Sequence, residues 1–111
     1  MNNTSEFTYL CKVTELQEGK GKRFYINGCD VAVFKIKDKI FALNNICPHQ
    51  KAAIIYDGTI EDGKISCPAH GWQFNMATGC YADGRKGLDV YDIQVADDKV
   101  FIKVFEREFK W

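Results

Sequence analysis

The chain has 111 residues, of which 46% are hydrophobic and 14% aromatic, and these values predict one folded domain with a single core. Its 15 basic residues equal its 15 acidic residues, so we expect binding neither to nucleic acid nor to an anionic membrane surface. The N-terminal segment lacks the basic and apolar regions of a secretory signal, and no apolar run reaches the roughly 18 residues of a spanning helix. We therefore expect a cytoplasmic protein without a membrane anchor.

The first 44 residues are predicted to form short β-strands. Alternating or β-rich segments indicate four strands, at residues 7–12, 23–26, 30–36 and 40–43. Asn27-Gly28 is a strong signal for a two-residue hairpin turn. Residues 13–22 contain two glycines among charged residues, so we expect a loop there.

The second half continues the same pattern. Asp62-Gly63 predicts a hairpin between two short strands, and further strands are indicated at 72–74, 90–95 and 99–104. Residues 51–56 show no strict alternation and are expected to pack under the inorganic centre that the loops described next could hold. Many short strands at close spacing predict an all-β protein with an antiparallel sandwich or barrel.

Two short boxes carry the chemistry of the chain. Cys47-Pro48-His49 and Cys67-Pro68-Ala69-His70-Gly71-Trp72 contain both histidines and two of the five cysteines. Each box offers one sulfur and one imidazole from a tight loop, so the two loops could close on one inorganic centre. The same donor set suits a tetrahedral zinc ion or a [2Fe–2S] cluster with two thiolates and two imidazoles. The candidate ligands for metal or cofactor are Cys47, His49, Cys67 and His70.

The two boxes resemble those of Rieske [2Fe–2S] proteins, and so do Gln73-Phe74 and Thr78-Gly79 downstream. The resemblance extends from about Phe7 to Val104. It implies one [2Fe–2S] cluster held by the four candidate ligands. A structural zinc finger usually separates its cysteines from its histidines, so the mixed boxes favour the cluster over zinc.

The resemblance also implies a Rieske-type fold. One domain, residues 1–111, would consist of a β-sandwich or barrel base, about 1–44 and 87–111, with a small cluster-binding lobe, about 45–86, inserted. Pro48 and Pro68 fix φ and so stiffen the two loops, and Gly71 is expected to permit close backbone approach or positive φ. Both histidines are expected near the surface, with the two box cysteines deeper.

Three positions place the chain in the low-potential, ferredoxin-type branch of the family. High-potential Rieske proteins carry an extra cysteine in each box, joined as a disulfide, and a serine hydroxyl near a bridging sulfide. The matching positions here are Ala52, Ala69 and Trp72. Hydrogen bonds around a cluster tune its reduction potential, so the absence of these features predicts a low value for a Rieske centre.

The implied function is transfer of single electrons between a reductase and a terminal oxidoreductase. The expected partners are a flavin-dependent reductase and an oxygenase, or the large subunit of an assimilatory NAD(P)H nitrite reductase if the chain is that enzyme's small subunit. A zinc-stabilised binding module is the least favoured hypothesis. A complete Rieske oxygenase is excluded, because its mononuclear iron needs two further histidines, and no catalytic residue is expected.

The remaining candidates have weaker signals. We expect Cys11, Cys29 and Cys80 to be reduced, buried thiols. Phe74 and Tyr81 are expected to belong to the core rather than to contact a cofactor. Three residues that flank the candidate ligands, Gln50, Lys51 and Trp72, are candidates for a rim that a partner touches.

Overall fold

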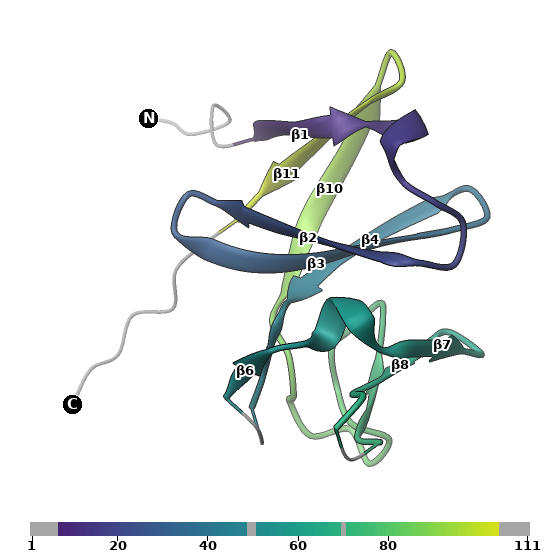
Figure 1. Cartoon of the computed structure of the whole chain (residues 1–111), viewed down its shortest axis with the longest axis vertical. Helices are drawn as coiled ribbons and strands as arrows, with labels where there is room; N and C mark the ends of the chain where they lie inside the picture. Colours follow the sequence, from purple (N-terminus) through teal and green to yellow (C-terminus); the bar gives the residue numbers. More distant parts are fainter. Residues whose placement is uncertain (1–6, 49–50, 70, 105–111) are drawn as a thin grey trace.

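A computed structural model describes residues 7–48, 51–69 and 71–104. Its main feature is a six-stranded antiparallel sheet (Figure 1). The described ranges contain no α-helix. The strand order is β1-β11-β10-β4-β3-β2. The strands are β1 (Thr8–Lys12), β2 (Gly21–Ile26), β3 (Cys29–Ile36), β4 (Lys39–Asn44), β10 (Val90–Ala96) and β11 (Lys99–Lys103). The all-β prediction is confirmed.

Two smaller sheets lie below this sheet in Figure 1. One pairs two short strands, β5 (Ile46–Cys47) and β6 (Ala52–Ala53). The other contains β7 (Thr59–Glu61), β8 (Lys64–Ser66) and β9 (Gln73–Asn75). The chain leaves the large sheet after β4 and returns at β10, which pairs directly with β4. Residues 45–89 are therefore an excursion between two neighbouring strands.

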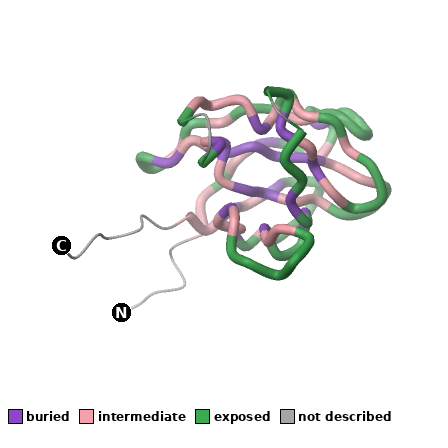
Figure 2. Tube along the Cα trace, turned by 90° about the horizontal axis from the view of Figure 1, so that it is seen from below, coloured by how far each residue is buried: buried purple, intermediate pink, exposed green. Residues whose placement is uncertain are grey.

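Strand β3 separates two hydrophobic clusters, because it is buried on both faces. Val31 and Val33 point to a cluster within the large sheet, whereas Ala32 and Phe34 point to a cluster shared with the excursion. This two-sided burial explains why residues 31–34 are all apolar and do not alternate with polar residues. The core thus has two parts, where the sequence predicted one. Figure 2 shows these buried segments enclosed by exposed loops.

The predicted hairpin turns are confirmed. Asn27 and Gly28 both have positive φ, 50° and 81°, and so do Asp62 and Gly63, 51° and 76°. Positive φ at both central residues matches the right-handed twist of the flanking strands, which is why these dipeptides are typical of tight hairpins.

The prediction that residues 13–22 form a loop is partly wrong. It contains a 3₁₀ helix, η2 (Val13–Glu15), and β2 begins at Gly21 rather than at residue 23. A second 3₁₀ helix, η3 (Ile55–Asp57), follows β6. Single 3₁₀ turns are too short to produce a periodic pattern. Within the described residues, no helix is long and apolar enough to cross a membrane.

Candidate metal centre

Two buried thiols meet at the centre of the excursion. Cys47 ends β5 and is fully buried, and Cys67 follows β8 with 1% exposure. Their sulfur atoms lie 3.3 Å apart. A disulfide bond would measure about 2.05 Å, and no disulfide joins any of the five cysteines. The two boxes therefore converge through their cysteines, which are both buried.

The first box forms a tight turn that places Cys47. The Lys51 N–H donates to the Cys47 carbonyl at 2.7 Å, and Lys51 has φ of 56°. The chain then reverses into β6, so Ala52 lies directly opposite Cys47. Ala52 carries no thiol that could cross-link this loop.

The second box forms a turn closed by two backbone hydrogen bonds. The Gly71 N–H donates to the Cys67 carbonyl at 2.9 Å, and the Cys67 N–H donates to the Trp72 carbonyl at 2.8 Å. Gly71 has φ of 74°, and a Cβ there would meet no atom within 4 Å. Glycine is therefore needed for positive φ, one of the two predicted reasons, and not for close approach.

His49, Gln50 and His70 lie outside the described residues, so their predicted roles and positions remain predictions. The described ranges contain no group of three or more His, Cys, Asp or Glu residues that could hold a metal. Among the candidate ligands, only the sulfur atoms of Cys47 and Cys67 can therefore be compared with the geometry of a metal site. Two thiolates on one tetrahedral metal, each about 2.3 Å from it, lie about 3.8 Å apart. The observed separation is close to this value, so the pair suits two ligands on one metal atom and leaves zinc and iron open.

An apolar enclosure surrounds the two sulfurs. Ile55, Ile65 and Phe74 are fully buried in the hydrophobic cluster that contains both cysteines. Phe74 is thus a core residue, as predicted. Such a setting excludes water and strengthens electrostatic interactions with whatever binds there.

An exposed aromatic rim lies beside the second box. The Trp72 side chain is 41% exposed, and its ring meets Tyr81 edge-on at 6.0 Å between centroids. The Arg85 guanidinium lies 5.0 Å from the Tyr81 ring centroid, and these residues line a hollow of about 440 Å³. Tyr81 is half-buried and packs against the core, as predicted, and desolvation raises its pKa. Lys51, a predicted rim residue, is also exposed.

The family model for the Rieske [2Fe-2S] domain matches residues 6–105, nearly the whole chain. The chain belongs to the Rieske [2Fe-2S] family. Membership decides between the two open metals, because the family carries a [2Fe–2S] cluster and its ligand set contains two thiolates on one iron. The buried cysteine pair has the side chains and the spacing for two such ligands.

Individual relatives are described with different functions. The chain is 28% identical over 96 residues to ferredoxin CarAc of Metapseudomonas resinovorans, covering 84% of this chain and 89% of that protein. It is 32% identical over 74 residues to the ferredoxin component of the alkene monooxygenase system of Xanthobacter autotrophicus, covering 67% and 61%. A human protein, apoptosis-inducing factor 3, is 28% identical over 100 residues, but the match spans 88% of this chain and only 16% of that protein.

The fold has a solved counterpart. A crystal structure described as the small subunit of an NADPH nitrite reductase superimposes with a TM-score of 0.80 at 25% identity, covering 86% of this chain and 96% of that one. This agreement confirms the Rieske-type fold.

The three other cysteines differ in their burial. Cys11 and Cys29 are buried in the cluster of the large sheet, as predicted. The prediction of a buried thiol is wrong for Cys80, which is partly exposed. Cys80 follows a turn and lies outside the named strands, with an isolated bridge to Lys86 and a hydrogen bond from the Asn75 N–H to its carbonyl.

One residue near the site has no sequence signal. Asn45 directly precedes β5 and is the one buried polar or charged residue among those the structure describes. Asparagine is common in turns and connections, so the sequence assigns Asn45 only to the segment that leads into the first box. Its role depends on tertiary contacts.

Proposed function

We propose that this chain is an electron-transfer protein of the Rieske ferredoxin type, with its [2Fe–2S] cluster held by Cys47, His49, Cys67 and His70. The observation that carries the proposal is the buried pair of cysteine sulfurs, 3.3 Å apart, in a member of this family. A bound cluster of this kind supplies one-electron oxidation and reduction. The chain offers no convincing catalytic group of its own, so we assign it no catalytic residue.

The proposed division of labour follows the topology. Residues 45–86 would form the cluster-binding lobe, and residues 1–44 and 87–111 the base of the same single domain. Support comes from the pairing of β4 with β10, which holds both ends of the excursion on adjacent strands. The two closed turns then fix the cysteine backbones, and the apolar enclosure excludes water from the sulfurs.

The partners are proposed from the named relatives. Relatives named as ferredoxin components of monooxygenase and dioxygenase systems support an oxygenase as electron acceptor. A flavin-dependent reductase is the donor that we propose. The exposed Trp72 and Lys51 beside the two boxes suit a surface that a partner protein touches. We place this carrier in the cytoplasm, where cysteines remain reduced.

The second candidate is the small subunit of an assimilatory NAD(P)H nitrite reductase. It is favoured by the crystal structure with that description, of which the match covers 96%. A tight complex with a large catalytic chain is expected in this case, and transient binding to an oxygenase in the first. Co-purification with the product of a neighbouring gene distinguishes the two.

The test of the cluster is direct. Protein produced with ample iron is expected to be red-brown and to contain about two iron and two sulfide per chain. Stoichiometric zinc without iron would overturn the proposal and favour the zinc-stabilised module. Reduction of the purified protein by an NAD(P)H-dependent flavin reductase, followed by oxidation by an oxygenase, tests the carrier role.

A further inference from the structure

Asn45 closes the loop that carries Cys47. We call the two ends of this loop, Asn45 on one side and Ile55-Tyr56 on the other, the loop neck. The Ile55 N–H donates to the Asn45 carbonyl at 3.2 Å, and the Tyr56 N–H donates to Asn45 Oδ1 at 2.7 Å. Residues 46–54, which include the first box and the β5–β6 pair, lie between these contacts along the chain. Asn45 therefore holds the two ends of this loop together.

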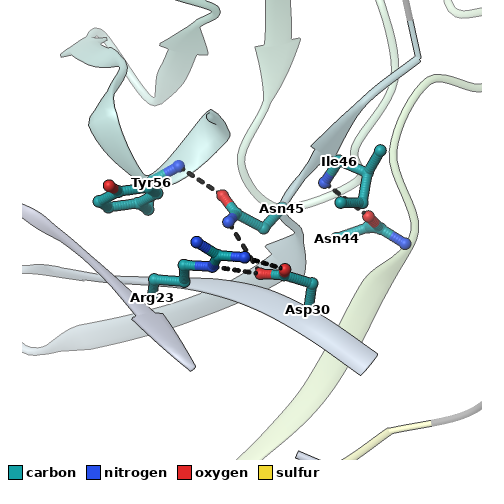
Figure 3. A network of polar contacts seen from close by, with 6 residues as sticks. All are labelled: Arg23, Asp30, Asn44, Asn45, Ile46 and Tyr56. Atoms are coloured by element: carbon teal, nitrogen blue, oxygen red, sulfur yellow. Dashed lines mark hydrogen bonds and ion pairs between the residues drawn. The ribbon is translucent and has the colours of Figure 1, made fainter. Parts of the chain in front are cut away.

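The same residue fixes the neck to the large sheet (Figure 3). The Asn45 N–H donates to the Asp30 carbonyl at 2.9 Å, and Asn45 Nδ2 donates to Asp30 Oδ1 at 2.9 Å. The Arg23 guanidinium, on β2, donates to both oxygens of the same carboxylate at 3.0 and 2.7 Å. Bidentate pairing of this kind fixes the orientation of the carboxylate.

The backbone N–H and carbonyl of Asn45 and the two polar groups of its side chain are thus all hydrogen-bonded, two to β3 and two to η3, and the residue has no exposed surface. Only a residue with one donor and one acceptor on the same short side chain satisfies both sides. A buried group that loses such a partner is costly, because water cannot replace it.

A second observation shows that the two parts fit closely here. A Cβ added at Gly21, on β2, would lie 2.1 Å from the Tyr56 carbonyl oxygen. Tyr56 in η3 is therefore fixed against the sheet at two points. Its N–H donates to the Asn45 side chain, and its carbonyl lies close against the backbone of Gly21. The neck of the loop has little freedom to shift.

We propose that Asn45 is a positioning residue for the cluster: it fixes the first ligand loop, and through that loop the Cys47 sulfur, by clamping the loop neck to Asp30. It acts through Cys47, two residues away. The inference rests on the proposed ligand role of Cys47. It predicts that a change at Asn45 alters retention of the cluster and its electronic state, beyond any effect on stability.

The test uses a polarity swap in the cluster-loaded protein. Asn45→Asp replaces the donor by a second carboxylate oxygen facing Asp30, and like charges at this distance repel. The double variant N45D/D30N restores one donor and one acceptor between positions 45 and 30 in reversed order, because the amide at position 30 then donates to the carboxylate at position 45. Its amide nitrogen replaces the oxygen that accepts from Arg23 Nε–H, so that one bond is lost. Val100→Ala is the matched control, since Val100 is fully buried in the other hydrophobic cluster.

The readouts are the rate of cluster loss to a chelator, the EPR spectrum of the reduced protein and its midpoint potential. Asn45→Asp is expected to lose its cluster about 10-fold faster than wild type, the lower end of what supporting residues contribute, with a shifted spectrum and potential. The double variant is expected to recover part of both, because the contact between positions 45 and 30 returns while the Arg23 Nε–H bond does not. Val100→Ala is expected to lower thermal stability while keeping the wild-type spectrum and potential.

Two results would overturn the inference: Asn45→Asp no different from Val100→Ala in cluster loss and spectrum, or a double variant as impaired as Asn45→Asp. If Asn45→Asp yields no folded protein, the milder Asn45→Ala, which removes both side-chain hydrogen bonds of Asn45 without adding a charge, replaces it and is judged against the same control. Iron and sulfide in the wild-type protein test the proposed function separately, so failure of one does not imply failure of the other.

Discussion

Two kinds of buried cysteine can be distinguished by what lies beside them. Cys47 and Cys67 face each other across 3.3 Å, at the ends of two turns. Cys11 is equally buried, but it lies on β1 within the core of the large sheet. Burial raises the pKa of the Cys11 thiol, with a smaller contribution from Glu15. A thiol held neutral in this way is a poor metal ligand, because metals bind the thiolate.

This contrast gives the first prediction. Cys47→Ala and Cys67→Ala are each expected to abolish the cluster, because one iron would lose one of its two thiolates. Cys11→Ala is expected to keep a full cluster, with only a loss of stability. Iron content and visible absorbance of the three purified variants measure this. A full cluster in either box variant would remove that cysteine from the ligand set.

At the scale of elements, the turn after β9 is held by close backbone packing. Gly79 has φ of 78°, its N–H donates to the Asn75 carbonyl, and its carbonyl accepts from the Leu88 N–H. A Cβ at Gly79 would lie 2.0 Å from the Leu88 carbonyl oxygen. Gly63, in the β7–β8 hairpin, has nearly the same φ, 76°, but a Cβ there meets nothing within 4 Å.

The second prediction uses this pair. Gly63→Ala is expected to cost about 1 kcal/mol, the strain of a left-handed conformation. Gly79→Ala adds a backbone collision to the same strain, and is expected to cost about 3 kcal/mol or more, in the range of severe packing defects. Chemical unfolding of both variants checks the difference. Equal losses would show that the turn after β9 can move aside.

The strands could be predicted because their signals are local. Period-2 alternation indicated β1, β10 and β11, and the Asn27-Gly28 and Asp62-Gly63 dipeptides fixed two hairpins. The predicted start of β2, residue 23 instead of Gly21, was wrong because glycine usually weakens a strand. Here Gly21 is needed for the contact with Tyr56 in η3, a tertiary requirement that no local pattern contains.

The candidate site divides in the same way. The two cysteines could be identified from box spacing, and their burial and convergence followed. Asn45 could not, because its four hydrogen bonds join β3 to η3, and these elements become neighbours only in the folded chain. The pairing of β4 with β10, which brings residues 43 and 90 together, likewise needed the structure.

At the scale of the whole molecule, acid stability depends on the carboxylate that joins the sheet to the loop neck. The hydrogen bonds from Arg23, and next the one from Asn45, hold the pKa of Asp30 below its ordinary value although partial burial opposes this. A carboxyl whose folded pKa is depressed stabilises the fold above its unfolded pKa. That contribution is lost as pH falls from about 4 through the folded value.

The third prediction follows from this sign. Asp30→Asn is expected to lower the free energy of unfolding at pH 7 by about 1 kcal/mol, a value discounted because Arg23 is half-exposed. The difference from wild type should shrink towards pH 3. Comparing the two proteins cancels acid effects that both share, such as protonation of the metal ligands. Asp83→Asn is the control, since its pair with Arg85 is exposed, and a difference that persists unchanged at pH 3 would contradict the assignment.

The last prediction concerns the reduction potential of the whole protein. Positions 52 and 69, where high-potential Rieske proteins carry the two disulfide-forming cysteines, are both alanine here, so that disulfide between the loops cannot form. Ala52 lies directly opposite Cys47, and Ala69 is exposed. Trp72 occupies the position where high-potential Rieske proteins carry a serine hydroxyl, and its ring packs edge-on against Tyr81. Fewer hydrogen bonds to the cluster sulfurs leave the reduced state less stabilised. We therefore expect a midpoint near the lower end of the Rieske range, which runs from about −150 to +300 mV.

Protein-film voltammetry at neutral pH measures this midpoint, and a value above about +150 mV, the upper half of the range, would contradict the argument. Two variants isolate the cause. Trp72→Ser supplies a hydroxyl and is expected to raise the midpoint, whereas Trp72→Ala removes the same ring without adding a donor and is expected to leave the midpoint lower than that of Trp72→Ser. Equal midpoints in the two variants would mean that the hydroxyl does not reach a sulfur, and that the potential is set by the backbone N–H groups of the two turns.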